Sequence, residues 1–106
     1  MPLRQPPSHR DVYALGDERN RVKIGISNDI RKRMSDLQTG TADNLRLIHS
    51  EKAERSIATK VERGARKMLS DTGKSGVREW RNDVSDDEAR EAIRVAHDIE
   101  RGRNRK

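Results

Sequence analysis

Large apolar side chains are scarce in this chain, and their scarcity limits it to a single small core. The 106 residues include 19 Val, Ile and Leu residues and no Phe, while 40% of the residues are charged. So little apolar material supports one domain rather than two. The apolar residues nevertheless recur at strand and helix periods, which a disordered chain has no reason to maintain. We therefore expect one small domain of marginal stability.

Several protein classes are excluded by what the sequence lacks. No apolar run approaches the roughly 18 residues of a membrane-spanning helix, so we expect a soluble, cytoplasmic protein with no membrane partner. There is no cysteine, which excludes disulfides, thiol nucleophiles and cysteine zinc sites. The histidines at 9, 49 and 97 are too scattered along the chain to suggest a histidine metal cluster. Any bound metal is therefore expected to use oxygen ligands.

Charge is distributed unevenly along the chain. Residues 1–10 and 101–106 together carry six basic and no acidic residues, and we interpret them as a flexible tail and a basic tail beside one domain over 11–100. Residues 19–81 hold 16 basic against 8 acidic residues, whereas 82–100 hold 2 against 7. The basic excess favours a surface that binds phosphate, although solubility alone also accounts for it.

Apolar alternation and turn residues predict a β-hairpin near the N-terminus. Residues 11–15 form the expected first strand, residues 16–21 the turn and residues 22–27 the second strand. Alternate residues of a strand face opposite sides, so Lys23 is expected on the open face of the hairpin. The expected core-facing residues of the second strand are Val22, Ile24 and Ile26.

A capped helix is expected directly after the hairpin. Asn28 or Asp29 can cap a helix that runs through Gln38 and is closed by Gly40. Helical periodicity places Arg33 at the edge of the buried stripe and directs Arg31 and Lys32 away from the core. The expected buried stripe consists of Ile30, Met34 and Leu37.

The second half of the chain predicts a third strand and two further helices. A strand is expected over 45–50, and a helix over 53–69 with Glu62 at the rim of its apolar face. Residues 77–81 form a short extended piece in which Trp80 is expected to fill the core. The sequence 85–88 has the form of a capping box and begins an acidic helix that reaches about residue 100, with His97 in solvent and His49 in a structural place on the third strand.

The hairpin and the two middle helices carry a set of motifs in a recognisable order. They are Val12-Tyr13, Lys23-Ile24-Gly25, Arg33 eight residues after that glycine, and a helical Glu62. This set resembles the GIY-YIG nuclease superfamily. It is most similar to a small phage and bacterial DNA-binding branch related to the meiotically up-regulated gene products, whose second motif begins Val-Lys-Ile-Gly. Further matches, within a resemblance that covers residues 11–81, are Leu37-Gln38-Thr39-Gly40, the strand with Leu45, Leu47 and Ile48, Glu62-Arg63, and Glu79-Trp80.

The resemblance implies a fold and a reaction. The implied fold is an α/β (α+β) domain with a small three-stranded, mainly antiparallel sheet flanked by helices. The implied reaction is hydrolysis of DNA phosphodiester bonds by an endonuclease that uses one divalent ion, Mg²⁺ or Mn²⁺, with Glu62 as its ligand. Tyr13 would activate or position the attacking water, helped by the neighbouring cation of Lys23. Arg33 would hold the scissile phosphate.

The same resemblance and the basic charge imply DNA as the partner. The residues expected to contact it are Arg31, Lys32, Arg33, Arg63 and Arg66. With no second recognition domain, we expect low sequence selectivity unless the chain forms a homodimer or joins a larger complex.

Three positions depart from the superfamily pattern and keep other functions open. Asp11 stands where a glycine is usual, Lys23 where a tyrosine is usual, and Arg66 where this branch commonly has a histidine. Arg66 follows Glu62 by four residues, so it could neutralise that carboxylate and remove it from metal binding. The alternatives are a non-catalytic DNA-binding module on the same fold, or a regulatory protein-interaction domain that uses the acidic segment 82–100.

Overall fold

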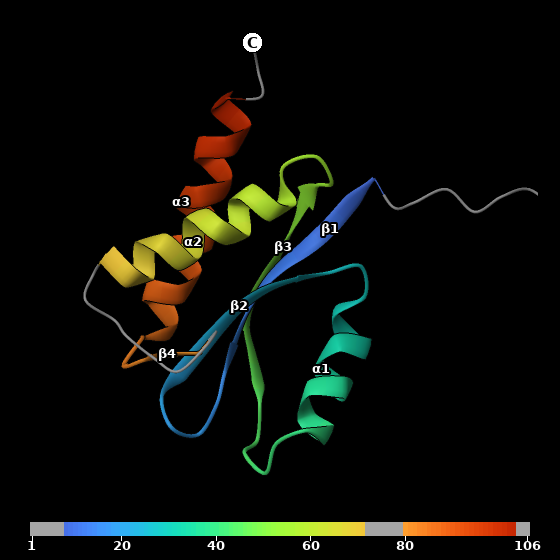
Figure 1. The fold of residues 1–106 in the computed structure, drawn as a ribbon, viewed down its shortest axis with the longest axis vertical. Coiled ribbons are helices and arrows are strands. Elements are labelled where there is room, and N and C mark those ends of the chain that lie inside the picture. Colours follow the sequence, from blue (N-terminus) through green and yellow to red (C-terminus); the bar gives the residue numbers. More distant parts are fainter. Residues whose placement is uncertain (1–7, 72–79, 104–106) are drawn as a thin grey trace, which may run out of the picture.

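A computed structural model describes residues 8–71 and 80–103 of the chain. Its strands form a single sheet in the order β3-β1-β2-β4, and every pair of neighbouring strands is antiparallel (Figure 1). The elements are β1 (His9–Gly16), β2 (Arg21–Ser27), α1 (Ile30–Thr39), β3 (Arg46–Glu54), α2 (Ala58–Asp71), β4 (Trp80–Asn82) and α3 (Asp86–Arg103).

The sheet has a fourth strand, so the prediction of three strands is wrong. β4 comes from the expected extended piece around Trp80 and pairs with Arg21, Val22 and Lys23 of β2. Residues 77–79 of that piece lie outside the described residues. A strand of three residues carries too little alternation to predict its pairing, because its partner is about sixty residues earlier in the chain. Trp80 itself is half-buried beside β2, with the Arg21 guanidinium 5.3 Å from its ring centroid, rather than in the core.

Helices cover both faces of the sheet. α2 and α3 pack together on one face, and α1 lies on the other side (Figure 1). No helix in the described ranges is long and apolar enough to cross a membrane. The core lies between the sheet and the pair α2/α3, and its fully buried members include Val12, Ala14, Val22, Ile24, Val61, Ala65, Ala89 and Ile93.

The predicted caps and alternation are confirmed. Asp29 caps α1, accepting a hydrogen bond from the Lys32 backbone N–H at 3.2 Å, and Gly40 closes the helix. Ser85 and Glu88 form the expected reciprocal capping box of α3. The apolar stripe of α1 is half-buried rather than buried, because that helix makes few contacts with the sheet.

β3 is longer and α2 shorter than predicted. The predicted helix start at Ala53 is wrong, because Ala53 lies in β3 opposite Arg10 of β1. β1 itself starts at His9, inside the segment interpreted as a tail, and so offers β3 a pairing partner as far as Glu54. The extra pairing delays the helix until Ala58.

The tight turn between β1 and β2 is held by one buried carboxylate. Asp17 accepts hydrogen bonds from the backbone N–H groups of Arg19 and Arg21, at 3.0 and 2.9 Å, and from the Arg21 Nε at 2.7 Å. Burial raises the pKa of the Asp17 carboxyl, but the hydrogen bonds from Arg21 and Arg19 outweigh burial and place the pKa below its ordinary value. Asn20, with φ of 59°, completes the turn.

Tyr13 and Gly25 face each other across the hairpin on the α1 side of the sheet. They are direct partners in the β1–β2 register, and Tyr13 is only 2% exposed. A methyl group on Gly25 would overlap the phenol oxygen and come within 2.5 Å of Cζ. The ring of Tyr13 therefore occupies the space that any side chain at position 25 would need.

A half-buried carboxylate, Glu51, joins β3 to α3. Its carboxylate binds His49 Nε2 at 2.7 Å and also binds Nδ1 of His97, which lies on α3. His97 is 4% exposed, so its predicted solvated place is wrong, whereas His49 has the structural place expected of it. Burial raises the pKa of the Glu51 carboxyl, but the hydrogen bonds from His49 and His97 outweigh it, so the pKa lies below its ordinary value of 4.5.

The Glu51 contacts predict a specific pH dependence. Because the folded-state pKa is lowered, the contribution of Glu51 to stability is present above its unfolded pKa and is lost as the pH falls through the folded one. The decrease in the free energy of unfolding caused by Glu51→Gln should therefore be largest above pH 4.5 and become smaller as the pH falls below this value. Urea denaturation at several pH values measures it. The exposed Asp36→Asn is the control, and a Glu51→Gln deficit that stays constant down to pH 3 would contradict the assignment.

The packing of Tyr13 predicts that Gly25→Ala is costly. The added methyl must displace the tyrosine ring, and overpacking of this kind costs about 1–3 kcal/mol in the free energy of unfolding. Because the chain has a single tyrosine, displacement can be followed by the NMR shifts of its ring protons. Gly40→Ala is the matched control, since its nearest contact would be an ordinary 3.7 Å. Equal stability and unchanged ring shifts in both variants would refute the close approach.

Candidate functional site

The outer edge of β2 is paired with β4 up to Lys23 and is free of strand pairing, within the described residues, from Ile24 onward. β4 pairs with β2 only as far as Lys23. From Ile24 onward, within the described parts of the chain, β1 is the only strand that pairs with β2. The Ile24 carbonyl accepts a hydrogen bond from Arg66 of α2 at 3.3 Å instead. Two of the predicted site residues, Glu62 and Tyr13, lie near this open stretch of edge: Glu62 through Arg66 at Ile24, and Tyr13 over Gly25.

Glu62 reaches this edge from α2. One guanidinium nitrogen of Arg66, Nη2, lies 3.3 Å from the Glu62 carboxylate and 3.3 Å from the Ile24 carbonyl oxygen. The two oxygens therefore lie no more than twice that distance apart. The Glu62 side chain is 14% exposed, which agrees with its predicted place at the rim of the core. The predicted ion pair with Arg66 is also present.

Tyr13 and Lys23 reach the same segment from the α1 face of the sheet. Tyr13 covers Gly25, and Lys23 lies in the next row between Leu15 and Trp80. This face was expected to be open, but Tyr13 and Leu15 are buried on it and Lys23 is half-buried. The reason is that α1 folds back over the hairpin immediately after β2 ends (Figure 1).

Arg33 lies on one flank of α1. It is exposed, and it shares that flank with Asp36 and Leu37, which line a pocket together with Trp80 and Arg21. α1 begins just beyond the end of β2, and by Leu37 it has reached the level of Trp80. Arg33 lies one turn before Leu37 on this flank.

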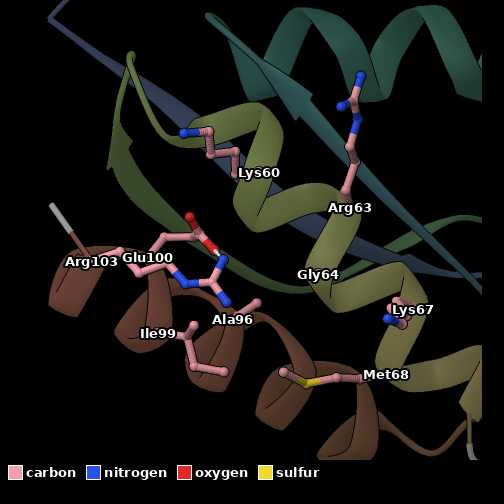
Figure 2. A pocket seen from close by; sticks show the side chains of 9 residues that line it. All are labelled: Lys60, Arg63, Gly64, Lys67, Met68, Ala96, Ile99, Glu100 and Arg103. Atoms are coloured by element: carbon pink, nitrogen blue, oxygen red, sulfur yellow. Dashed lines mark hydrogen bonds and ion pairs between the residues drawn. The ribbon is translucent and has the colours of Figure 1, made fainter.

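The remaining cations predicted to contact DNA have different surroundings. Arg31 and Lys32 are exposed on α1, as helical periodicity predicted. Arg63 is exposed on α2 and points away from α3 (Figure 2). Arg66 is half-buried and is engaged by Glu62 and Ile24, so its charge is shared with internal oxygens.

The donor set at this edge is compatible with a hard divalent ion. Within residues 8–71 and 80–103, no group of three or more His, Asp or Glu side chains is arranged to hold a metal. Mg²⁺ commonly binds through one or two carboxylates, completing its octahedral shell with substrate phosphate and water. Glu62 would supply one such carboxylate, provided that it shares or releases Arg66.

Some of the cationic residues near β2 and on α2 were not singled out by the sequence. Arg21 and Trp80 form a cation–π pair beside the Arg33 flank, joined by pairing between β2 and β4 that has no local signal. Lys60 and Lys67 flank Arg63 at one-turn spacings on α2, which helical periodicity could have revealed. Glu51 and the two histidines it binds meet on the α3 side of the sheet, away from the Tyr13 face.

Comparison with known proteins identifies the family. The model of the T5orf172 domain matches residues 11–97. No curated protein and no solved structure is significantly similar to the chain. The expected membership of the GIY-YIG superfamily is therefore wrong, since T5orf172 is a different family. The resemblance depended on short motifs within residues 11–81, whereas the family match continues through most of α3. The chain belongs to the T5orf172 domain family, a family associated with DNA binding and nuclease-like function.

Proposed function

We propose that this domain is a DNA endonuclease that hydrolyses phosphodiester bonds with the help of one divalent metal ion. The observation that carries the proposal is that the side chains of Glu62 and Tyr13, from α2 and β1, lie next to two adjacent residues of β2. Arg66 ties Glu62 to the carbonyl of Ile24, and Tyr13 covers Gly25. A carboxylate and a phenol from opposite faces of the sheet thus converge at its open edge.

Glu62 is the proposed metal ligand. Its carboxylate oxygens are the hard donors that Mg²⁺ and Mn²⁺ prefer. When bound, such an ion supplies positive charge at the scissile phosphate and lowers the pKa of a nearby water. The neighbouring Arg66 keeps the carboxylate oriented toward β2 until substrate arrives.

Arg33, Tyr13 and Lys23 have the proposed positioning roles on the other face. The planar fork of Arg33 donates two hydrogen bonds to phosphate oxygens and stabilises the charge that builds up during attack. Tyr13 orients the attacking water or accepts its proton. Lys23, one row away on the same face, adds a positive charge to this side of the sheet.

The distribution of charge supports DNA as the substrate. Arg31, Lys32, Arg33 and Arg63 are all exposed on α1 and α2. Cations that neutralise phosphates release condensed counterions, so binding should weaken steeply with salt. Contacts between such cations and phosphates position a protein on DNA but carry no sequence information directly.

Glu62→Gln should abolish metal-dependent cutting. Loss of the carboxylate ligand is expected to lower the single-turnover cleavage rate at least about 100-fold, because a bound metal stabilises the transition state by several kcal/mol. Affinity for the same DNA should change little. Glu91→Gln, which removes an exposed carboxylate paired with Arg94, is the matched control and should cut normally. Wild-type rates in Glu62→Gln would contradict the assignment.

Arg33→Lys should slow cleavage more than it weakens binding. Lysine keeps the charge but loses the planar fork, so we expect a loss of about tenfold or more in the cleavage rate. The same exchange at Arg31, which points away from β2, should leave the rate unchanged. Single-turnover rates and salt-dependent affinities for one duplex measure both effects. Equal rates in the two variants would remove Arg33 from the site.

A non-catalytic DNA-binding module is the second candidate, and the Glu62–Arg66 ion pair favours it. If Arg66 holds Glu62 permanently, the carboxylate cannot bind metal. Wild-type protein that binds DNA at low salt but gives no cuts with Mg²⁺ or Mn²⁺ would select this candidate. If cutting appears or increases in Arg66→Ala, the domain is an enzyme whose activity the Glu62–Arg66 ion pair restrains.

A further inference from the structure

A groove lies between α2 and α3 on the side of these helices away from the sheet (Figure 2). Its volume is about 510 Å³. It is separate from the open edge of β2, and Arg63 is the one lining residue that also belongs to the cations proposed to contact DNA. α2 contributes Lys60, Arg63, Gly64, Lys67 and Met68, and α3 contributes Ala96, Ile99, Glu100 and Arg103.

The floor of the groove is apolar. Gly64 and Ala96 mark the close approach of the two helices, since a methyl group on Gly64 would come within 3.2 Å of the Ala96 side chain. Ile99 and Met68 line the groove beside this crossing (Figure 2). Ile99 is 44% exposed and is one of two large hydrophobic residues exposed in the described parts of the chain. Solvent therefore contacts apolar surface that a partner could bury.

The rim of the groove on α2 is basic, and its charges have no ion-pair partner within the described part of the chain. Lys60, Arg63 and Lys67 make no ion pair with any residue that the structure describes. On α3 the arrangement is the opposite, because each described arginine of that helix has a carboxylate within 4 Å. These pairs are Arg90 with Asp87, Arg94 with Glu91, Arg101 with Asp98 and Glu51, and Arg103 with Glu100.

The three cations form a stripe along α2. Spacings of three and four residues place them on one helix face, and from Lys60 to Lys67 the stripe extends about 10 Å, two helical turns. An α-helix lying alongside would present residues at the same spacings. Acidic residues three or four positions apart on that helix would meet the stripe, and its apolar residues would cover Ile99 and Met68.

We infer that the α2/α3 groove is a docking site for an acidic amphipathic helix of a partner protein. Charge complementarity selects the partner's Asp and Glu residues, and the apolar floor selects its Leu-like anchors, as in other helix-in-groove interactions. Duplex DNA fits less well, because a sugar-phosphate backbone would leave Ile99 uncovered. The α3 of a second copy also fits less well, since its apolar residues Ala89, Ala92, Ile93 and Ala96 are buried in its own core.

A labelled synthetic helix tests the inference. The probe is a fluorescein-tagged amphipathic peptide of Leu, Ala and Glu with glutamates flanking the leucine face, and its binding to the whole chain is followed by anisotropy. A peptide of the same composition in scrambled order controls for net charge. Ile99→Glu and the double variant Lys60→Glu/Lys67→Glu alter the floor and the rim. Lys52→Glu reverses one exposed charge on β3 as the matched control.

The amphipathic peptide should bind at least about tenfold more tightly than the scrambled one, because only its ordered apolar face can cover the groove floor. Both groove variants should weaken it by about tenfold or more, and Lys52→Glu should not. All variants should keep the wild-type far-UV spectrum, and Ile99→Ser is the milder substitute if Ile99→Glu unfolds.

Several results would overturn the inference. Equal binding of both peptides would show that the groove is only a nonspecific basic surface. Complete displacement of the peptide by a short DNA duplex, with duplex affinity falling in Lys60→Glu/Lys67→Glu, would assign the groove to nucleic acid. Ile99-dependent binding to phosphatidylglycerol vesicles without peptide binding would assign it to a lipid surface. Because Glu62-dependent cleavage is measured separately, failure here leaves the proposed nuclease activity standing, and the reverse also holds.

Discussion

The contact between Tyr13 and Gly25 is the constraint around which the candidate site is built. Position 25 has no room for a side chain, because the phenol ring lies over it. The outer edge of β2 is open beside Ile24 because β4 pairs only as far as Lys23, and Arg66 and Glu62 of α2 arrive there from the other face. Only two residues separate α1, which carries Arg33, from the end of β2. A hairpin with a larger residue at position 25 would keep its strands but lose this junction.

Sequence predicted the local parts of the fold well. Alternation in β2 identified Val22 and Ile24 as core residues, and both are 1% exposed. Caps are short-range hydrogen bonds, so Asp29 and the Ser85–Glu88 box could be predicted from their own neighbourhoods. The rim position of Glu62 followed from helical periodicity alone.

The parts that sequence missed depend on contacts between distant residues. His97 was expected in solvent because no local pattern shows that Glu51, 46 residues earlier, accepts its hydrogen bond. The hydrogen bond from Arg66 to Ile24 spans 42 residues, and the pairing of β4 with β2 spans 57 to 61. Ala53 has helical neighbours in the sequence, but the extension of β1 to His9 draws it into β3. The family was also misjudged, since short motifs around Tyr13 and Gly25 carried a resemblance that the match over residues 11–97 assigns elsewhere.

The central claim is that metal and DNA phosphate meet at the open edge of β2. The most direct test is Mn²⁺ titration of ¹⁵N-labelled protein bound to a phosphorothioate duplex that resists cleavage. Paramagnetic broadening should appear first at the backbone amides of Ile24, Gly25 and Glu62. Broadening that begins instead at the acidic first turn of α3, around Asp86 and Asp87, with the β2 amides unchanged, would contradict the account.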